Sequence, residues 1–233
     1  METKDPTIPD SNQPTFLRVD FHTHTIFSKD SLTTPEKLIA ACRRKGIDRV
    51  VVSDHNTIEG ALRCKELDPE RVIVGEEIMT TKGEILAAYV SEEIPAELSP
   101  LETIARLREQ NAFISVSHPC DAMRKGSWSL DALLEILPHV DAIETFNSRC
   151  MAPQSNWQAE KIARNYDIPG THGSDGHTTF EIGRGSLLLP PFEDAVSLKK
   201  ALKNAVSPRL TLSSPLVHFT SRYAVWRKRI SSR

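Results

Sequence analysis

The chain has 233 residues, of which 26% are charged and 39% hydrophobic, and its formal net charge is −2. This length suits one domain with a sizeable core, and an α/β barrel can exceed about 200 residues undivided. The nearly neutral balance gives no global sign of a nucleic acid or an anionic membrane as a partner. No window approaches the roughly 18 apolar residues that a transmembrane helix needs, so we expect no membrane span.

The ends of the chain and its cysteines give further expectations. Residues 1–14 are polar, contain proline and lack the apolar stretch of a signal peptide, so we predict a disordered lead-in. We expect a barrel domain over residues 15–213 and a basic C-terminal helix or tail over 214–233. The four cysteines form no CxxC pair, which favours reduced thiols in a cytoplasmic protein.

Short apolar runs alternate with helical patterns along the chain. The predicted strands are Phe16–Phe21, Arg49–Val52, Val72–Ile78, Ile85–Val90, Phe113–Ser117, Ala142–Phe146 and Ile168–His172. The predicted helices are Pro35–Lys45, Thr57–Glu66, Pro100–Gln110, Leu130–Leu137, Pro153–Asn165 and Glu193–Asn204. This alternation predicts parallel strands joined by crossover helices, in a closed or nearly closed barrel. The first strand is followed by no Gly-rich phosphate loop, which argues against a Rossmann fold.

Histidines and acids gather where the predicted strands end, and α/β barrels build their active sites at that edge. In the first group, Asp20, His22 and His24 stand two residues apart, so their side chains share one face of the strand. Two ordinary polar residues leaving a strand would give the same pattern. Ser53, Asp54, His55 and Asn56 form the second group, for which a capped helical turn is the alternative.

Three further groups follow the same rule. Glu76 and Glu77 end an apolar run, and Glu84 opens the next strand, where it could equally be a solvated turn residue. His118 closes the run FISVSH. Asp175 and His177 again stand two residues apart, beside glycines. Nitrogen and carboxylate ligands without thiolates suit Zn²⁺, Mn²⁺ or Fe²⁺ at a catalytic site.

Together these motifs resemble the PHP (polymerase and histidinol phosphatase) family. They are HTHT at 22–25, SDHNT at 53–57, GEEI at 75–78, SHP at 117–119 and GSDGH at 173–177. The resemblance spans about residues 16–190. It implies a distorted (β/α)7 barrel of the PHP type, two to three divalent metal ions and hydrolysis of phosphate esters by a metal-bridging hydroxide.

The resemblance also implies a set of ligands. The first metal would take His22, His24, Glu77 and Asp175, the second would share Glu77 and add Glu84 and His118, and the third would take Asp30, His55 and His177. Two positions depart from the family pattern. Glu84 stands where many members have histidine, and Asp30 is shifted by one residue from the usual acid.

The expected substrate is a small phosphorylated compound, either a phosphomonoester or a nucleotide. Candidate substrate-binding residues are Arg124, Arg149 and Arg184, because arginine binds phosphate through two donors at once, although each could equally be a surface ion-pair partner. Asn147, which follows a predicted strand, is a further candidate to line the site. A nuclease that trims oligonucleotides is an alternative, although the net charge does not indicate nucleic acid. A non-catalytic metal-binding PHP module and metal-assisted amide hydrolysis are further alternatives. The sequence leaves the oligomeric state open.

The C-terminal segment Ser214–Ile230 carries an apolar stripe at helical spacing. Its members are Leu216, Phe219, Tyr223, Trp226 and Ile230. From Arg222 to the end the chain carries basic residues and no acidic one. Two interpretations stay open, namely a helix whose apolar face packs on the barrel, and a contact with a membrane surface or a nucleic acid.

Overall fold

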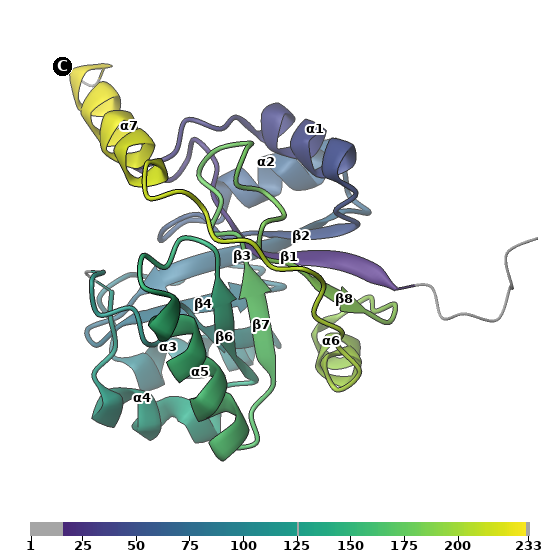
Figure 1. The fold of residues 1–233 in the computed structure, drawn as a ribbon, viewed down its shortest axis with the longest axis vertical. Coiled ribbons are helices and arrows are strands. Elements are labelled where there is room, and N and C mark those ends of the chain that lie inside the picture. The colour runs from purple at the N-terminus through teal and green to yellow at the C-terminus, as the bar shows by residue number, and fades with distance from the viewer. Residues whose placement is uncertain (1–15, 125, 232–233) are drawn as a thin grey trace, which may run out of the picture.

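The structure is a computed structural model that describes residues 16–231 except residue 125 (Figure 1). The lead-in predicted over 1–14 lies outside the described residues. One eight-stranded sheet forms the centre, in the order β7-β6-β5-β4-β3-β2-β1-β8. Its strands are β1 (Leu17–Thr23), β2 (Arg49–Val52), β3 (Val72–Met79), β4 (Glu84–Ala88), β5 (Phe113–Val116), β6 (Ala142–Asn147), β7 (Gly170–Gly173) and β8 (Leu187–Leu189).

The sheet curves until β1 meets the segment that follows β7. Gly176 donates its N–H to the carbonyl of His22 over 3.3 Å, and His24 donates to the carbonyl of Gly176 over 3.0 Å. This bridge nearly closes the barrel, which confirms the predicted distorted PHP-type barrel. β8 pairs antiparallel with β1 as an additional strand. The sequence pattern missed β8 because a three-residue run before a proline carries no periodicity.

The prediction of parallel strands throughout is wrong at β4, which pairs antiparallel with both β3 and β5. The turn over residues 80–83 is too short for the crossover that parallel strands need, so β3 and β4 form a hairpin. In this turn the Thr80 N–H donates to the carbonyl of Gly83 over 3.0 Å. Because β4 is antiparallel to β3 and β5, its first residue, Glu84, lies at the edge of the sheet where these two strands end.

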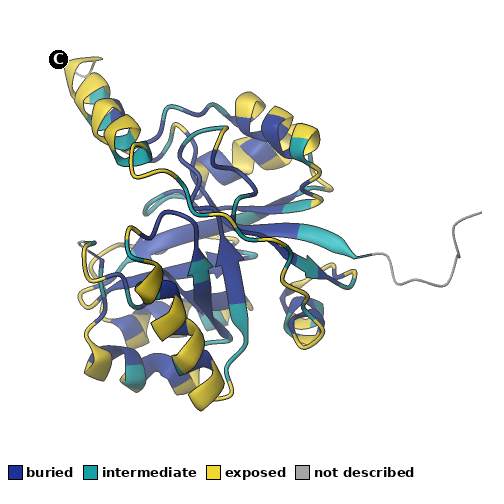
Figure 2. Ribbon diagram, viewed as in Figure 1, coloured by how far each residue is buried: buried dark blue, intermediate teal, exposed yellow. Residues whose placement is uncertain are grey.

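Most of the helices lie outside the sheet with their buried sides towards the core, whereas the C-terminal helix is exposed over most of its length (Figure 2). They are α1 (Pro35–Lys45), α2 (Glu59–Leu67), α3 (Pro100–Glu109), α4 (Leu130–Ile136), the 3-10 helix η1 (Leu137–His139), α5 (Pro153–Asn165), α6 (Ala195–Leu202) and α7 (Val217–Ser231). The predicted bounds Pro35–Lys45 are those of α1, which follows the cap Thr34 and is ended by Gly46 in the left-handed conformation that glycine tolerates. Within the described ranges, no helix has the length and apolarity to cross a bilayer.

Helix α7 contradicts the first interpretation of the C-terminal stripe. The stripe does not pack on the barrel, because all five side chains are more than half exposed. The opposite side of the helix carries the contacts, and Ala224 is its buried residue.

Candidate metal centre

The nine side chains assigned to metals from the sequence come together at one edge of the sheet. Glu77, near the end of β3, lies at their centre. Its Oε2 is 3.2 Å from His22 Nε2 and 3.1 Å from His55 Nδ1. Its Oε1 is 3.1 Å from His118 Nε2. Glu77 is buried, so a charge at this position needs partners that replace water.

The other acids extend the cluster on either side of Glu77. His24 Nε2 is 3.3 Å from Asp175 Oδ1, and His177 Nε2 is 3.1 Å from Asp30 Oδ2. On the far side, Glu84 Oε2 lies 3.4 Å from His118 Nε2.

Three overlapping sets of ligand atoms each lie within 4.8 Å of one another. They are His22, His24 and Glu77; His55, Glu77 and Glu84; and His24, His55 and His177. His55 therefore faces two sets, with Nδ1 towards Glu77 and Nε2 3.6 Å from Asp30 Oδ1. The sequence assigned His55 to the third site alone, and the ring lies between the second and third.

The unsatisfied atoms of the cluster fit divalent cations. Glu77 Oε2, Asp175 Oδ1, Asp30 Oδ1 and His177 Nε2 are buried and lack a hydrogen bond. Each such atom costs about 1–3 kcal/mol when nothing replaces water. Carboxylate oxygens and imidazole nitrogens that share one centre are the ligands Zn²⁺, Mn²⁺ and Fe²⁺ prefer. Metal binding would offset this cost.

In two of the histidines, Nδ1 contacts a neighbouring group and so fixes the orientation of the ring. His24 Nδ1 lies 3.0 Å from Ser28 Oγ, and His177 Nδ1 lies 2.8 Å from the carbonyl oxygen of Asp175. In both residues Nε2 is left for the cluster, as in metal sites where a neighbouring group fixes the ring orientation.

Glu144, in β6, orients His22, although it was not among the residues predicted from the sequence. Its Oε1 lies 3.0 Å from His22 Nδ1, and its Oε2 accepts a 2.8 Å hydrogen bond from the His118 N–H. A side chain on Gly173 would bring a Cβ within 2.3 Å of Glu144 Oε1, so this close approach requires glycine. The available signal was a carboxylate inside the predicted strand Ala142–Phe146.

Glu144→Gln should weaken metal binding about 10- to 100-fold, the usual loss when a group behind a metal-ligating histidine is changed. The amide keeps the size of the side chain but removes the charge that favours donation from His22 Nδ1. Titration of the metal-free protein with Mn²⁺ or Zn²⁺ measures the effect. Glu135→Gln, at an exposed position of α4, is the control. Equal affinity in both variants would exclude this role for Glu144.

Asp20, the first residue of the first predicted group, contacts the backbone. Its carboxylate accepts hydrogen bonds from the N–H groups of His22, Ser174 and Gly183 at 3.3, 2.9 and 2.7 Å. Burial raises the pKa of Asp20 to about 6, although these hydrogen bonds act in the opposite direction. Asp20 therefore ties β1 to the segment after β7, where the barrel closes.

Asp54 fixes the loop that leads to Asp30. Its carboxylate accepts hydrogen bonds from the N–H and hydroxyl of both Thr25 and Ser28, at 2.5–3.2 Å. It therefore braces two neighbouring strand ends and does not cap α2. Asn56, from the same motif, accepts the Met79 N–H over 2.8 Å.

The ionisable side chains of the cluster lie close enough to shift one another's pKa values. Burial, followed by the neighbouring His177 and His55, lowers the pKa of His24 to about 4. Burial would also lower the pKa of His22, but Glu77 and Asp175 raise it well above its usual value. Carboxylates therefore provide a strongly negative environment, which favours cations.

Two of the predicted substrate residues lie beside the cluster. Arg124 Nη1 is 2.6 Å from Asp175 Oδ2, and Arg124 Nη2 donates to Asn147 Oδ1 over 3.3 Å. Asn147 Nδ2 donates to Asp175 Oδ2 over 3.2 Å. Burial opposes the charge of Asp175, but Arg124 and His22 hold the pKa of this carboxyl well below its usual range.

The other two predicted substrate residues have structural partners. Arg149 is buried, and its Nε lies 3.2 Å from Glu181 Oε1. Its Nη2 donates to the carbonyl of Val217 and to Ser221 Oγ, which anchors α7. Arg184 donates to the carbonyls of Phe180 and Leu212. Their role in phosphate binding stays a prediction.

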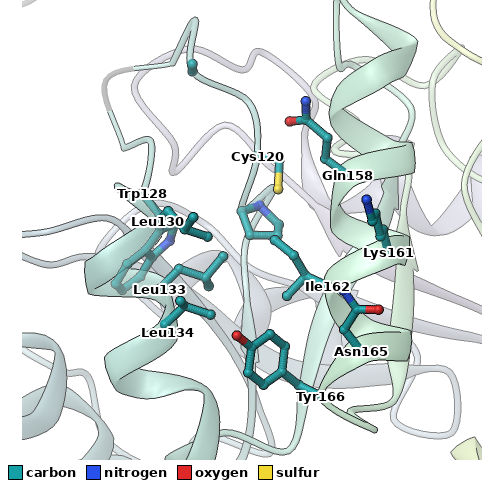
Figure 3. A pocket seen from close by; sticks show the side chains of 12 residues that line it. Cys120, Trp128, Leu130, Leu133, Leu134, Gln158, Lys161, Ile162, Asn165 and Tyr166 are labelled. Carbon is teal, nitrogen blue, oxygen red and sulfur yellow. The ribbon is translucent and has the colours of Figure 1, made fainter.

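A separate cavity of about 500 Å³ lies between α4 and α5, behind the loop that follows His118 (Figure 3). Its walls are mostly apolar, and Trp128, Leu133, Ile162 and Tyr166 point into it. None of the nine candidate ligands lines it. The metal cluster and this cavity are therefore distinct places in the fold.

Comparison with known proteins agrees with the motifs. The PHP domain family matches residues 20–125, and the family described as PHP-associated matches residues 153–206. An uncharacterized protein of Methanocaldococcus jannaschii is 37% identical over 170 residues, which cover 72% of this chain and 68% of that protein. The chain belongs to the PHP family. A second uncharacterized protein of this organism is 35% identical over 149 residues, covering 57% of this chain and 82% of its own length.

Solved structures share the PHP fold at low identity. A two-domain protein from Bacteroides vulgatus, described as containing a predicted PHP-like metal-dependent phosphoesterase, matches with a TM-score of 0.66, 18% identity and coverage of 96% of this chain and 74% of that chain. An amidohydrolase from Chromobacterium violaceum matches with a TM-score of 0.62 and 12% identity, and the match covers 82% of this chain and 98% of that chain. A lesion-specific endonuclease from Pyrococcus furiosus matches with a TM-score of 0.60 and 16% identity, and the match covers 86% of this chain and 60% of that chain.

Proposed function

We propose that this PHP protein is a metal-dependent phosphoesterase that hydrolyses a small phosphate ester, either a phosphomonoester or a nucleotide. The observation that supports it best is the position of Glu77, which lies within 3.4 Å of nitrogens from His22, His24, His55 and His118. A carboxylate between several imidazoles is suited to bridging two cations. The family membership supports the same chemistry.

The charges of the cluster also favour an anionic substrate. The proposed ligands include four carboxylates, from Asp30, Glu77, Glu84 and Asp175. Two to three divalent cations would supply four to six positive charges, so three cations would leave an excess for a phosphate group. When bound, such cations would lower the pKa of water from near 16 towards about 7 and neutralise phosphate oxygens.

The side chains around the cluster would orient the substrate. Arg124 is held against Asp175 and is 22% exposed, so part of its guanidinium can reach an incoming phosphate. Asn147 lies between Arg124 and Glu144 and keeps the arginine beside the proposed ligands. We propose Arg124 and Asn147 as phosphate-positioning residues, and a cytoplasmic location based on the cysteine pattern.

A nuclease is the second candidate, because the lesion-specific endonuclease shares the fold. A screen of the metal-loaded protein against phosphomonoesters, dinucleotides, short RNA and an N-acyl amide separates the candidates. We expect the protein to release phosphate from a monoester or a nucleotide. EDTA should abolish this activity, and the Asp175→Ala variant should lack it. Cleavage of the oligonucleotide alone would favour the nuclease, and cleavage of the amide alone would favour amide hydrolysis. No turnover with Mn²⁺, Zn²⁺ or Fe²⁺ would indicate a non-catalytic module.

A further inference from the structure

Helix α7 has two opposite sides. One side faces the barrel and carries the less exposed residues, at the spacing of successive helical turns. These residues are Val217, His218, Ser221, Ala224, Val225 and Lys228. Since a helix turns by 3.6 residues, the stripe from Leu216 to Ile230 lies on the other side. Figure 2 shows exposed residues along the whole helix.

The contacts with the barrel hold this orientation at both ends of the helix. Near its start, Arg149 Nη2 donates to the carbonyl of Val217 over 3.1 Å and to Ser221 Oγ over 3.0 Å. Near its end, the Lys228 ammonium donates to the carbonyls of Ile26 and Ser28, in the loop after β1. The stripe is therefore held away from the barrel by polar contacts and does not result from a frayed end.

The stripe is large and unusually exposed for a soluble surface. Its exposed fractions are 68% for Leu216, 65% for Phe219, 51% for Tyr223, 57% for Trp226 and 54% for Ile230. Contiguous apolar patches of this kind mark interaction sites, because leaving them in water is unfavourable.

Basic side chains flank the stripe and indicate the charge of its partner. Arg222 and Arg229 lie along one border and Arg227 along the other, and all three are exposed. The helix contains no aspartate or glutamate. These charges favour an anionic partner.

A second copy of the chain fits this surface poorly. The spacing of the stripe is that of a coiled-coil seam, but the flanking positions are arginines, so two such helices would place like charges together. Tyr223 and Trp226 at the middle of the seam also differ from the aliphatic residues that pack in coiled coils. A base-stacking platform would use the aromatic rings but not Leu216 or Ile230.

We propose that α7 lies on an anionic lipid bilayer, with the stripe from Leu216 to Ile230 in the headgroup region and the three arginines at lipid phosphates. Phenylalanine, tryptophan and leucine on one face with arginine beside them are the composition of helices that lie in a membrane interface. The helix has 15 residues and would be about 22 Å long, too short to span a bilayer. The stripe contains none of the nine proposed metal ligands, and the proposal does not depend on the proposed hydrolysis.

The test is sedimentation of the full-length protein with vesicles of phosphatidylcholine alone or mixed with phosphatidylglycerol. We expect binding to the mixed vesicles, at least tenfold weaker binding to phosphatidylcholine, and weakening by salt. The double variant Phe219→Ser/Trp226→Ser should lose binding while keeping its circular dichroism spectrum. The matched control is Phe180→Ser/Trp157→Ser, which removes the same residue types at exposures of 80% and 66% elsewhere.

The charge has its own test. Arg227→Gln/Arg229→Gln should weaken binding roughly thirtyfold, since each basic residue near an anionic surface contributes about 1 kcal/mol. If the protein binds neither kind of vesicle, the proposal is overturned. So does a stripe-dependent dimer in light scattering, or binding of a single-stranded oligonucleotide by the stripe without vesicle binding. Hydrolysis of a soluble substrate should stay unchanged in the stripe variant.

Discussion

Glu77→Gln should reduce metal-dependent phosphate ester hydrolysis by about 1,000-fold or more. The amide lacks the charge that holds cations between His22, His55 and His118. The loss of about 4 kcal/mol of transition-state stabilisation, within the range that metal ions supply, gives approximately this factor. Steady-state kinetics with saturating Mn²⁺ or Zn²⁺ measures it.

Glu76→Gln is the matched control for this prediction. Glu76 is the adjacent buried acid, but its Oε2 accepts the Ile94 N–H over 3.0 Å, away from the proposed ligands. A glutamine can keep this acceptor, so activity should stay close to that of the unchanged protein. An equal loss in both variants would mean that Glu77→Gln acts through the fold rather than through metal binding.

Removal of metal should lower the melting temperature by roughly 5–10 °C. A ligand at 100 times its dissociation constant stabilises the folded state by about 2.7 kcal/mol, and each kcal/mol is worth about 2–4 °C in a protein of this size. The physical cause is the buried, unsatisfied oxygens of Glu77, Asp175 and Asp30 in the metal-free state. Calorimetry with and without EDTA, followed by added Mn²⁺ or Zn²⁺, measures the shift.

The double variant His118→Ala/Asp175→Ala is the control for the thermal shift. It removes one proposed ligand from each side of Glu77 and should respond to metal by less than half as much. An unchanged melting temperature in the natural protein, together with only trace metal by elemental analysis, would contradict the metal cluster.

Alternation of side chains along a strand was enough to predict that His22 and His24 share a face. A second local pattern predicted that His55, His118 and Asp175 lie at strand ends, because each of their motifs follows an apolar run in the sequence. The helix start at Pro35 and its end at Gly46 were also predictable, since caps depend on a few neighbouring residues. These features are local in the sequence.

The contacts of Glu144 and the direction of β4 were not predicted, for different reasons. Glu144 and His22 are far apart in the chain and meet only after the sheet has curved. The direction of β4 depends on a local hairpin turn. The turn over 80–83 did contain a signal, since it is too short for a crossover. The alternating pattern of strands and helices outweighed it in the prediction.

By itself the sequence determined the family, the barrel and the residue types of the proposed metal centre, because short motifs and periodicity are encoded locally. Only the tertiary structure placed Glu77 among the histidines and made Asp20 a tie in the barrel closure. It also turned the stripe of α7 away from the barrel. Periodicity shows which residues share one side of a helix, but the contacts of Arg149 and Lys228 decide which side faces the protein.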